Sequence, residues 1–217
     1  MGRRPRQFDA GIYHLGSHGS DRRHLYVCDD DRSDFLDRLS STFWTREIDL
    51  LSYALLGNHY HCLVQIPDHR LSEALQRLHT EYSRHHNQRH GRGAHLFRAH
   101  CFARRITDTD DLLGAYRYIA RNPVEAGLAQ NPLDWPWAST RAHAGLEPPA
   151  IPIHERPLAA ALGHTPGWRR RYAELILIPE QESKSDAAYA LHGKRTRMER
   201  AGIEPATSGL QSRRSPS

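Results

Sequence analysis

The chain has 217 residues, of which 38% are hydrophobic, and its formal net charge is +5. No apolar run approaches the roughly 20 residues that a helix needs to cross a bilayer, and the basic start MGRRPRQFDAG has no apolar core behind it, so we expect a soluble cytoplasmic protein without a secretory signal. Three cysteines without C-x-x-C spacing argue against a disulfide framework and a zinc knuckle.

The first half of the chain predicts a strand, a helix and then a pair of strands. Phe8 to Ser17 has strand-like sequence, and a polar turn region follows from Asp21 to Asp31. From Arg32 to Glu47 the apolar residues recur at helical spacing, which predicts an amphipathic helix. Ile48 to Leu56 then predicts a strand, and a tight turn at Gly57-Asn58 leads into a second strand that ends before the next proline.

The second half completes the pattern. A helix is expected from Leu71 to about Gly91 or Gly93, followed by an arginine-rich strand from Leu96 to Ile106 and by a third helix that Asp108 caps and Pro123 closes. Strand, helix, strand, strand, helix, strand is the ferredoxin-like or RRM-like order of an α+β protein, with one antiparallel sheet and two helices on a single face. Such a sheet is a common platform for single-stranded nucleic acid, and the third helix must lie beside or across it.

Two histidines, His59 and His61, open the second strand of the predicted hairpin. Side chains at positions i and i+2 of a strand point to the same face, so both imidazoles can reach one metal ion. The alternative is that they are only polar residues on a half-exposed strand, because the chain holds 16 histidines and such pairs arise by chance.

The segment from Arg70 to Arg105 is basic, with eight arginines against two acids, Glu73 and Glu81. Codon bias explains a preference for arginine over lysine but not the shortage of acids, so we expect a polyanionic partner such as nucleic acid. The candidates for phosphate contacts are Arg84, Arg89, Arg92, Arg98, Arg104 and Arg105.

The third predicted helix presents a phenol and an amide together. Tyr118 and Asn122 are four residues apart and share a helical face, whereas Tyr116 points elsewhere. If this face meets the histidine pair, the site holds a nucleophile, two nitrogen ligands and one oxygen ligand. The alternative for Tyr118 is an ordinary core aromatic.

Three motifs in this order resemble one known family. They are N-H-Y-H-C at 58 to 62, Y-R-Y-I-A-R-N-P-V-E-A-G at 116 to 127, and D-W-P-W-A-S-T at 134 to 140. Over residues 8 to 142 the chain resembles the REP-associated tyrosine transposases, within the single-tyrosine HUH transposases of the IS200-like family. Tyr60 departs from the small aliphatic residue expected between the histidines, which is tolerable because it points to the opposite face.

The resemblance implies an enzyme that nicks DNA and transfers strands. Tyr118 would be the nucleophile, and His59, His61 and Asn122 would hold a divalent ion, Mg²⁺ or Mn²⁺. Attack by the phenolate on a phosphodiester would leave a 5′-phosphotyrosine and a free 3′-hydroxyl. The implied substrate is single-stranded or hairpin DNA at repeat elements, which would place the protein at the nucleoid. Tyr82 also lies on a basic helix, but its leucine neighbours favour a packing role.

The expected organisation is a basic arm at 1–7, the catalytic domain at 8–142, a proline-rich linker with a short helical extension at 143–179, and a disordered tail at 180–217. The oligomeric state, monomer or homodimer, stays open. Two other functions remain as alternatives: a non-catalytic nucleic-acid-binding protein derived from a transposase, and a metal-dependent hydrolase that uses water. The hydrolase would need more carboxylates near the histidines than Asp68 supplies.

Overall fold

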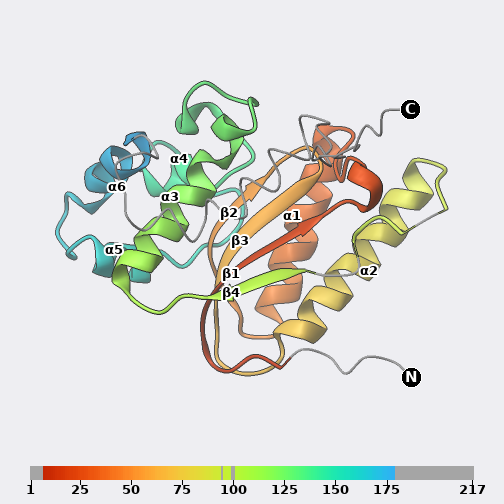
Figure 1. The fold of residues 1–217 in the computed structure, drawn as a ribbon, viewed down its shortest axis with the longest axis horizontal. Helices are drawn as coiled ribbons and strands as arrows, with labels where there is room; N and C mark the ends of the chain where they lie inside the picture. The colour runs from red at the N-terminus through yellow and green to blue at the C-terminus, as the bar shows by residue number, and fades with distance from the viewer. Residues whose placement is uncertain (1–6, 94, 99–100, 179–217) are drawn as a thin grey trace, which may run out of the picture. The chain divides into compact units, whose positions relative to one another are not determined.

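A four-stranded antiparallel sheet lies at the centre of the fold, with the strand order β2-β3-β1-β4 (Figure 1). The strands are β1 (Gly11–His18), β2 (Asp49–Leu55), β3 (His59–Ile66) and β4 (Phe102–Arg105). The two strands of the histidine hairpin pair with each other, and β1 lies between β3 and β4. The predicted ferredoxin-like α+β arrangement is confirmed.

The structure is a computed structural model that describes residues 7–93, 95–98 and 101–178. These residues all belong to the unit Met1–Glu182. The expected tail at 180–217 lies outside the described residues, and so does the expected basic arm except for Gln7. In the described part of the chain, no helix is both long enough and apolar enough to cross a membrane.

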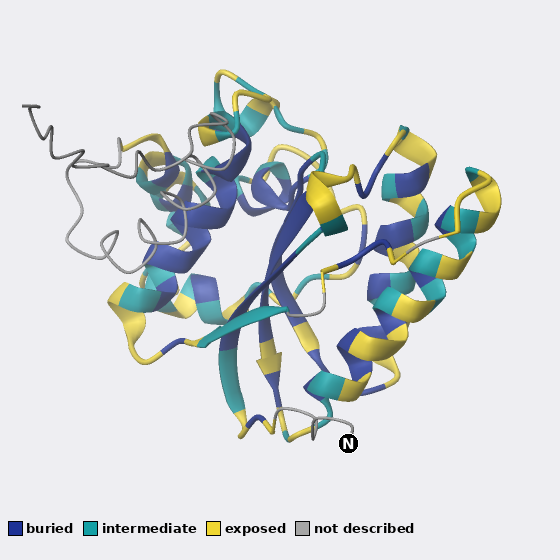
Figure 2. Cartoon of the chain, turned by 45° about the vertical axis from the view of Figure 1, so that its right-hand side comes forward, coloured by how far each residue is buried: buried dark blue, intermediate teal, exposed yellow. Residues whose placement is uncertain are grey.

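Two helices, α1 (Asp29–Trp44) and α2 (Leu71–Arg89), pack side by side on one face of the sheet. Their inward faces are buried, while their outward faces are exposed (Figure 2). Phe35 of α1 and Tyr82 of α2 contact each other edge to face, and Phe35 also meets the ring of Tyr60. The main hydrophobic core therefore lies on this side, and Tyr60 points into it as expected.

The opposite face of the sheet is covered by α3 (Thr109–Glu125), which contacts β2 and β3. The short helix α4 (Thr140–His143) follows, and α5 (Arg156–Ala161) and α6 (Trp168–Leu177) pack against α3. Two 3-10 turns complete the described elements, Ser20–Arg22 and Pro132–Asp134. The third helix thus lies across the sheet rather than beside it, so this face is not an open platform.

The third motif, at 134 to 140, pairs with the outer strand β2. Leu55 donates its N–H to the Trp137 carbonyl at 2.8 Å, and the Trp135 indole donates to the Leu55 carbonyl at 2.8 Å. Ser139 accepts from the Tyr53 N–H at 3.0 Å through its hydroxyl. Because an uncovered edge strand invites pairing with other chains, this segment protects the edge of the sheet at β2.

Several predicted boundaries are wrong for physical reasons. Among the described residues of the strand expected from Leu96 to Ile106, the continuous ladder with β1 covers the four residues Phe102–Arg105, and Arg98 and Ile106 each add one backbone hydrogen bond, to His18 and Ile12. The first helix begins at Asp29, inside the expected turn region, because Asp31 caps it by accepting from the Cys28 N–H. Pro123 does not close the third helix, because a proline in the last turn removes few hydrogen bonds. The helix continues to Glu125, and the chain turns away at Gly127, where φ is +71°.

The proline-rich stretch after Gly145 packs against the rest of the fold. Ile151 is buried in the main core, and the His154 N–H donates to the Leu50 carbonyl at 2.7 Å. The short helical extension expected within 143–179 is present as α6. This part of the expected linker is therefore anchored to β2.

Candidate active site

The pairing of β1 with β3 builds the floor of the site. His59 lies opposite His18, and His61 lies opposite Gly16, all on the face that α3 covers. The rings of His59 and His61 are nearly perpendicular, with centroids 5.2 Å apart. Both side chains are buried, so they are not polar residues pointing into solvent.

Gly16 leaves the space in which the His61 ring lies. A Cβ atom at position 16 would stand 3.0 Å from His61 Nδ1 and 3.2 Å from the Tyr60 carbonyl oxygen. Separations this short are tighter than ordinary van der Waals contact. A larger residue at position 16 would therefore require His61 or the strand next to it to shift by a few tenths of an ångström.

Helix α3 supplies the other side of the site. Asn122 Oδ1 lies 3.2 Å from His59 Nε2, and the ring of Tyr118 lies edge-on to His61 with centroids 5.3 Å apart. The structure therefore brings the histidine pair together with Tyr118 and Asn122. These four residues come from two elements that are distant in the sequence.

Two further histidines belong to the cluster and were missed in the sequence. His14 Nε2 lies 3.1 Å from His61 Nδ1, and its ring also contacts Tyr118 at a centroid distance of 5.5 Å. The ring of His18 stacks on His59 at 4.7 Å. The signal was present in H-L-G-S-H at 14 to 18, because alternate residues of a strand share a face, as they do in H-Y-H.

The hydrogen bonds of the site suit a bound cation. Asn58 Oδ1 lies 2.8 Å from His59 Nδ1, so in the neutral ring Nδ1 carries the proton and Nε2 presents a lone pair. That lone pair faces Asn122 Oδ1, which is also an acceptor. Two ligands of one ion at usual bond lengths stand about 3.0–3.4 Å apart. The 3.2 Å separation of these two atoms therefore fits a shared metal ion.

The other tyrosines of the basic segment and of α3 lie elsewhere. Tyr116 faces away from the sheet and contacts His143 and Tyr172, and burial raises its pKa well above the usual value. Tyr82 lies in the core on the opposite side of the sheet, where its hydroxyl donates to the Leu25 carbonyl at 2.5 Å. Its leucine neighbours indicated a packing role, and the core between α1, α2 and the sheet encloses its hydroxyl.

The six candidate arginines do not form one cluster at the site. Arg84 and Arg89 are on α2, behind the sheet, and Arg89 pairs with Asp30. Arg104 forms a two-pronged ion pair with Asp111 at 2.6 and 2.9 Å, which ties β4 to the start of α3. Arg92, Arg98 and Arg105 are exposed.

Comparison with known proteins gives the family. No curated protein matches the chain. A solved structure described as a REP-associated tyrosine transposase bound to a REP hairpin has 17% sequence identity and a TM-score of 0.56, covering 71% of this chain and 93% of that one, and so shares the fold. Residues 9–122, more than half of the chain, match the family described as "Transposase IS200 like", and they include both histidines of the pair, Tyr118 and Asn122. The chain therefore belongs to the IS200-like transposase family.

Proposed function

We propose that this protein is a metal-dependent endonuclease and strand transferase for single-stranded DNA, and that it cleaves through a 5′-phosphotyrosine at Tyr118. The observation that carries the proposal is the convergence of Tyr118 and Asn122 of α3 on His59 and His61 of β3. An aromatic residue with only a packing role would not need three buried polar side chains around it.

His59, His61 and Asn122 are the residues that would hold a divalent ion, Mg²⁺ or Mn²⁺. When bound there, the ion supplies Lewis-acid chemistry by drawing charge from a non-bridging phosphate oxygen. His14 Nε2 contacts Nδ1 of His61 and so orients the His61 ring. This leaves Nε2 of His61 as the ligand atom. Asn58 does the same for His59.

The proposed reaction at Tyr118 exchanges one phosphate ester bond for another. Its phenol oxygen forms a bond to phosphorus as the bond from phosphorus to the 3′-oxygen breaks, the phenol loses its proton, and the departing oxygen gains one. The result is a 5′-phosphotyrosine and a free 3′-hydroxyl. A second 3′-hydroxyl reverses the step onto another strand, so no nucleotide triphosphate is consumed.

The proposed substrate is single-stranded or hairpin DNA at repeat elements. The solved structure that shares this fold is described as bound to a REP hairpin, which supports a hairpin for this chain too. The exposed candidates Arg84, Arg92, Arg98 and Arg105 would contact phosphates. Arg104 and Arg89 are already paired, with Asp111 and Asp30 respectively. Each would contact a phosphate only if DNA displaced its carboxylate partner.

The test is a denaturing gel of the protein incubated with a labelled hairpin oligonucleotide and Mn²⁺. The parent should form a covalent adduct that chelation of the metal prevents, and peptide mapping should find the modification on Tyr118. Tyr118→Phe should fold and bind DNA but form no adduct. An adduct mapped to Tyr116 or Tyr82 would refute the assignment, and tight binding by a parent without any adduct would favour the non-catalytic alternative.

Tyr82→Phe is the matched control, because it removes one phenol oxygen from the same basic protein. It leaves the Leu25 carbonyl without its buried donor, so we expect a loss of stability of about 1–3 kcal/mol. Cleavage by the folded protein should nevertheless be close to that of the parent. The pair of variants thus separates a loss of stability from a loss of chemistry.

A further inference from the structure

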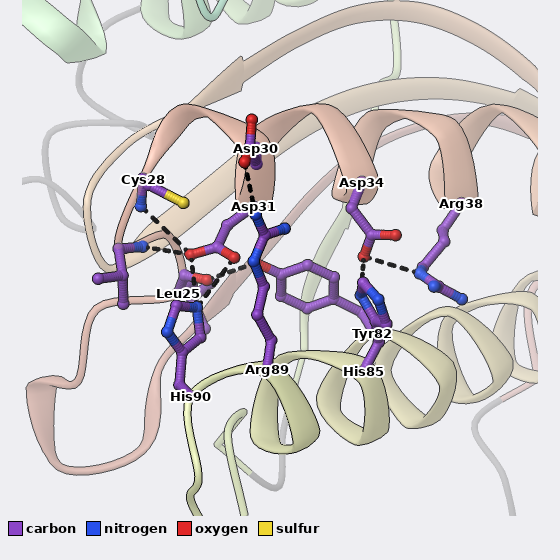
Figure 3. Close-up of polar contacts among 11 residues, drawn as sticks. Leu25, Cys28, Asp30, Asp31, Asp34, Arg38, Tyr82, His85, Arg89 and His90 are labelled. Carbon is purple, nitrogen blue, oxygen red and sulfur yellow. Dashed lines mark hydrogen bonds and ion pairs between the residues drawn. The ribbon is translucent and has the colours of Figure 1, made fainter.

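Three potential metal ligands lie between α1 and α2, behind the sheet as seen from Tyr118. They are Asp31 near the start of α1 and His86 and His90 at the end of α2. One ligand atom from each residue lies within 4.8 Å of the others. Figure 3 shows Asp31 and His90 facing each other in the space between the two helices.

The carboxylate of Asp31 is held in place by its neighbours. Its Oδ2 atom accepts from the backbone N–H group of Val27 at 2.7 Å. It also accepts from the backbone N–H group of Cys28 at 3.2 Å (Figure 3). His90 Nε2 lies 3.0 Å from both carboxylate oxygens. Arg89 does not neutralise Asp31 by direct pairing, since it pairs with Asp30. Bonds of this kind orient a carboxylate that serves as a metal ligand.

His86 is the second observation that points to a ligand. Its side chain is only 1% exposed, yet neither ring nitrogen makes a hydrogen bond with any residue that the structure describes. Buried polar atoms are nearly always satisfied by a protein group, a water molecule or an ion. One of its ring nitrogens lies within the cluster formed with Asp31 and His90, where an ion would satisfy it.

The ionisation of two of these residues is compatible with ligation. Burial lowers the pKa of His86 although the negative charge of Asp31 opposes the shift, so its ring is neutral at pH 7. Burial raises the pKa of Asp31, but the hydrogen bonds from His90, Val27 and Cys28 outweigh it and lower the net pKa. When an ion binds, His90 Nε2 gives up the proton that it donates to Asp31 and turns its lone pair to the ion. A neutral imidazole and an ionised carboxylate are the forms that bind metals.

We propose that Asp31, His86 and His90 form a second metal site, separate from the one at His59 and His61, that takes a transition metal ion such as Zn²⁺. Two histidines four residues apart, one in the last turn of α2 and the other at its C-cap, completed by a carboxylate, suit Zn²⁺ better than Mg²⁺, which prefers oxygen ligands. The role of the ion is structural, because it joins the start of α1 to the end of α2 and lies on the other side of the sheet from Tyr118.

The experiment uses the full-length protein with His59→Ala and His61→Ala, which removes the histidine ligands of the other proposed site. After the metal is stripped with a chelator, this double variant is titrated with ZnCl₂ by calorimetry and melted with and without Zn²⁺. We expect one molar equivalent to bind. At a hundredfold excess over Kd the melting temperature should rise by about 5–10 °C.

Two variants in the same background locate the ion, and one serves as a control. His86→Asn and His90→Gln should each abolish the binding and the shift in melting temperature. His85→Asn should keep both, because His85 is on the same helix but bonds to Asp34 outside the cluster. If His86→Asn fails to fold, Zn²⁺ binding by the His90→Gln variant decides the question, because His90 is only half-buried.

The proposal would be overturned if the double variant bound no Zn²⁺, or if a folded His90→Gln variant still bound one equivalent. Loss of binding in His85→Asn to the same degree would also overturn it, because the effect would then not depend on the cluster. None of these results depends on DNA cleavage, so the second site and the proposed function can fail independently.

Discussion

His14 offers the sharpest test of how the site is held together. Its Nε2 atom lies 3.1 Å from His61 Nδ1, and both rings are buried. His14→Phe keeps an aromatic ring of similar size next to Phe102 but removes the nitrogen. The variant should therefore fold, while His61 loses the neighbour that orients it.

The size of the effect follows from this contact. Leaving one buried polar atom without its partner costs about 1–3 kcal/mol. Removing a residue that orients a metal ligand lowers metal affinity by about 10–100-fold, which corresponds to about 1.4–2.7 kcal/mol. The two ranges agree, so the Mn²⁺ concentration that gives half-maximal cleavage should rise by about 10–100-fold in His14→Phe.

The assay is single-turnover cleavage of a hairpin oligonucleotide as a function of Mn²⁺ concentration. Saturating Mn²⁺ should restore most of the rate to His14→Phe, because Tyr118 is untouched. His14→Gln should lie between the parent and His14→Phe, since its amide can still bond to His61. An unchanged Mn²⁺ requirement in a folded His14→Phe variant would refute the positioning role, and so would a rate that saturating Mn²⁺ does not restore.

Three other predictions test separate parts of the structure. His59→Ala or His61→Ala should abolish strand cleavage and leave DNA binding, measured by gel shift, within a few-fold of the parent; full cleavage by the double variant would exclude the proposed metal ligands. Binding should weaken with salt, at a slope of log K against log salt between about −2.8 and −3.6 if Arg84, Arg92, Arg98 and Arg105 each contact a phosphate. A flat response would contradict those contacts. Burial raises the pKa of Glu155, but hydrogen bonds from His143 and Arg169 outweigh it and lower the pKa from 4.5 to about 2. The resulting stabilisation, about 1–2 kcal/mol for this partly exposed group, is complete above pH 4.5 and is lost as the pH falls toward 2. Urea unfolding of Glu155→Gln should show the loss at neutral pH and a weaker dependence on pH in that range.

The order of strands and helices could be predicted because it depends on local periodicity. Apolar residues at helical spacing identify α1 and α2, and the Gly57-Asn58 turn identifies the hairpin. The same local reasoning paired Tyr118 with Asn122, since residues four apart share a helical face. These features need no knowledge of which elements pack together.

The remaining features depend on long-range pairing and could not be predicted locally. His14 and His18 join the site only because β1 pairs with β3 in one register, and a shift of one residue would turn them to the other face. The length of β4 is set by its pairing with β1. Likewise, Asp31 and His86 meet only because α1 packs against α2.

The direction of Tyr118, the proposed nucleophile, is controlled by residues beyond the part of the chain that matches the family. Successive residues of an α-helix are about 100° apart, so a roll of α3 by about half that angle would turn Tyr118 away from the histidines. Tyr116 prevents such a roll, because its buried ring is packed against His143 of α4 and Tyr172 of α6.

Two arginines of α3 fix the same contact by hydrogen bonds. Arg117 donates to the Ile178 carbonyl at 2.7 Å, and Arg121 donates to the Ile176 carbonyl at 3.0 Å. Both carbonyls lie at the end of α6, within the stretch that we expected to be a linker with a helical extension. The aromatic contacts and these two hydrogen bonds all act on the outer side of α3, while Tyr118 and Asn122 face the histidines on its inner side. Residues 140–178 therefore hold α3 from its outer side and set the direction in which Tyr118 points.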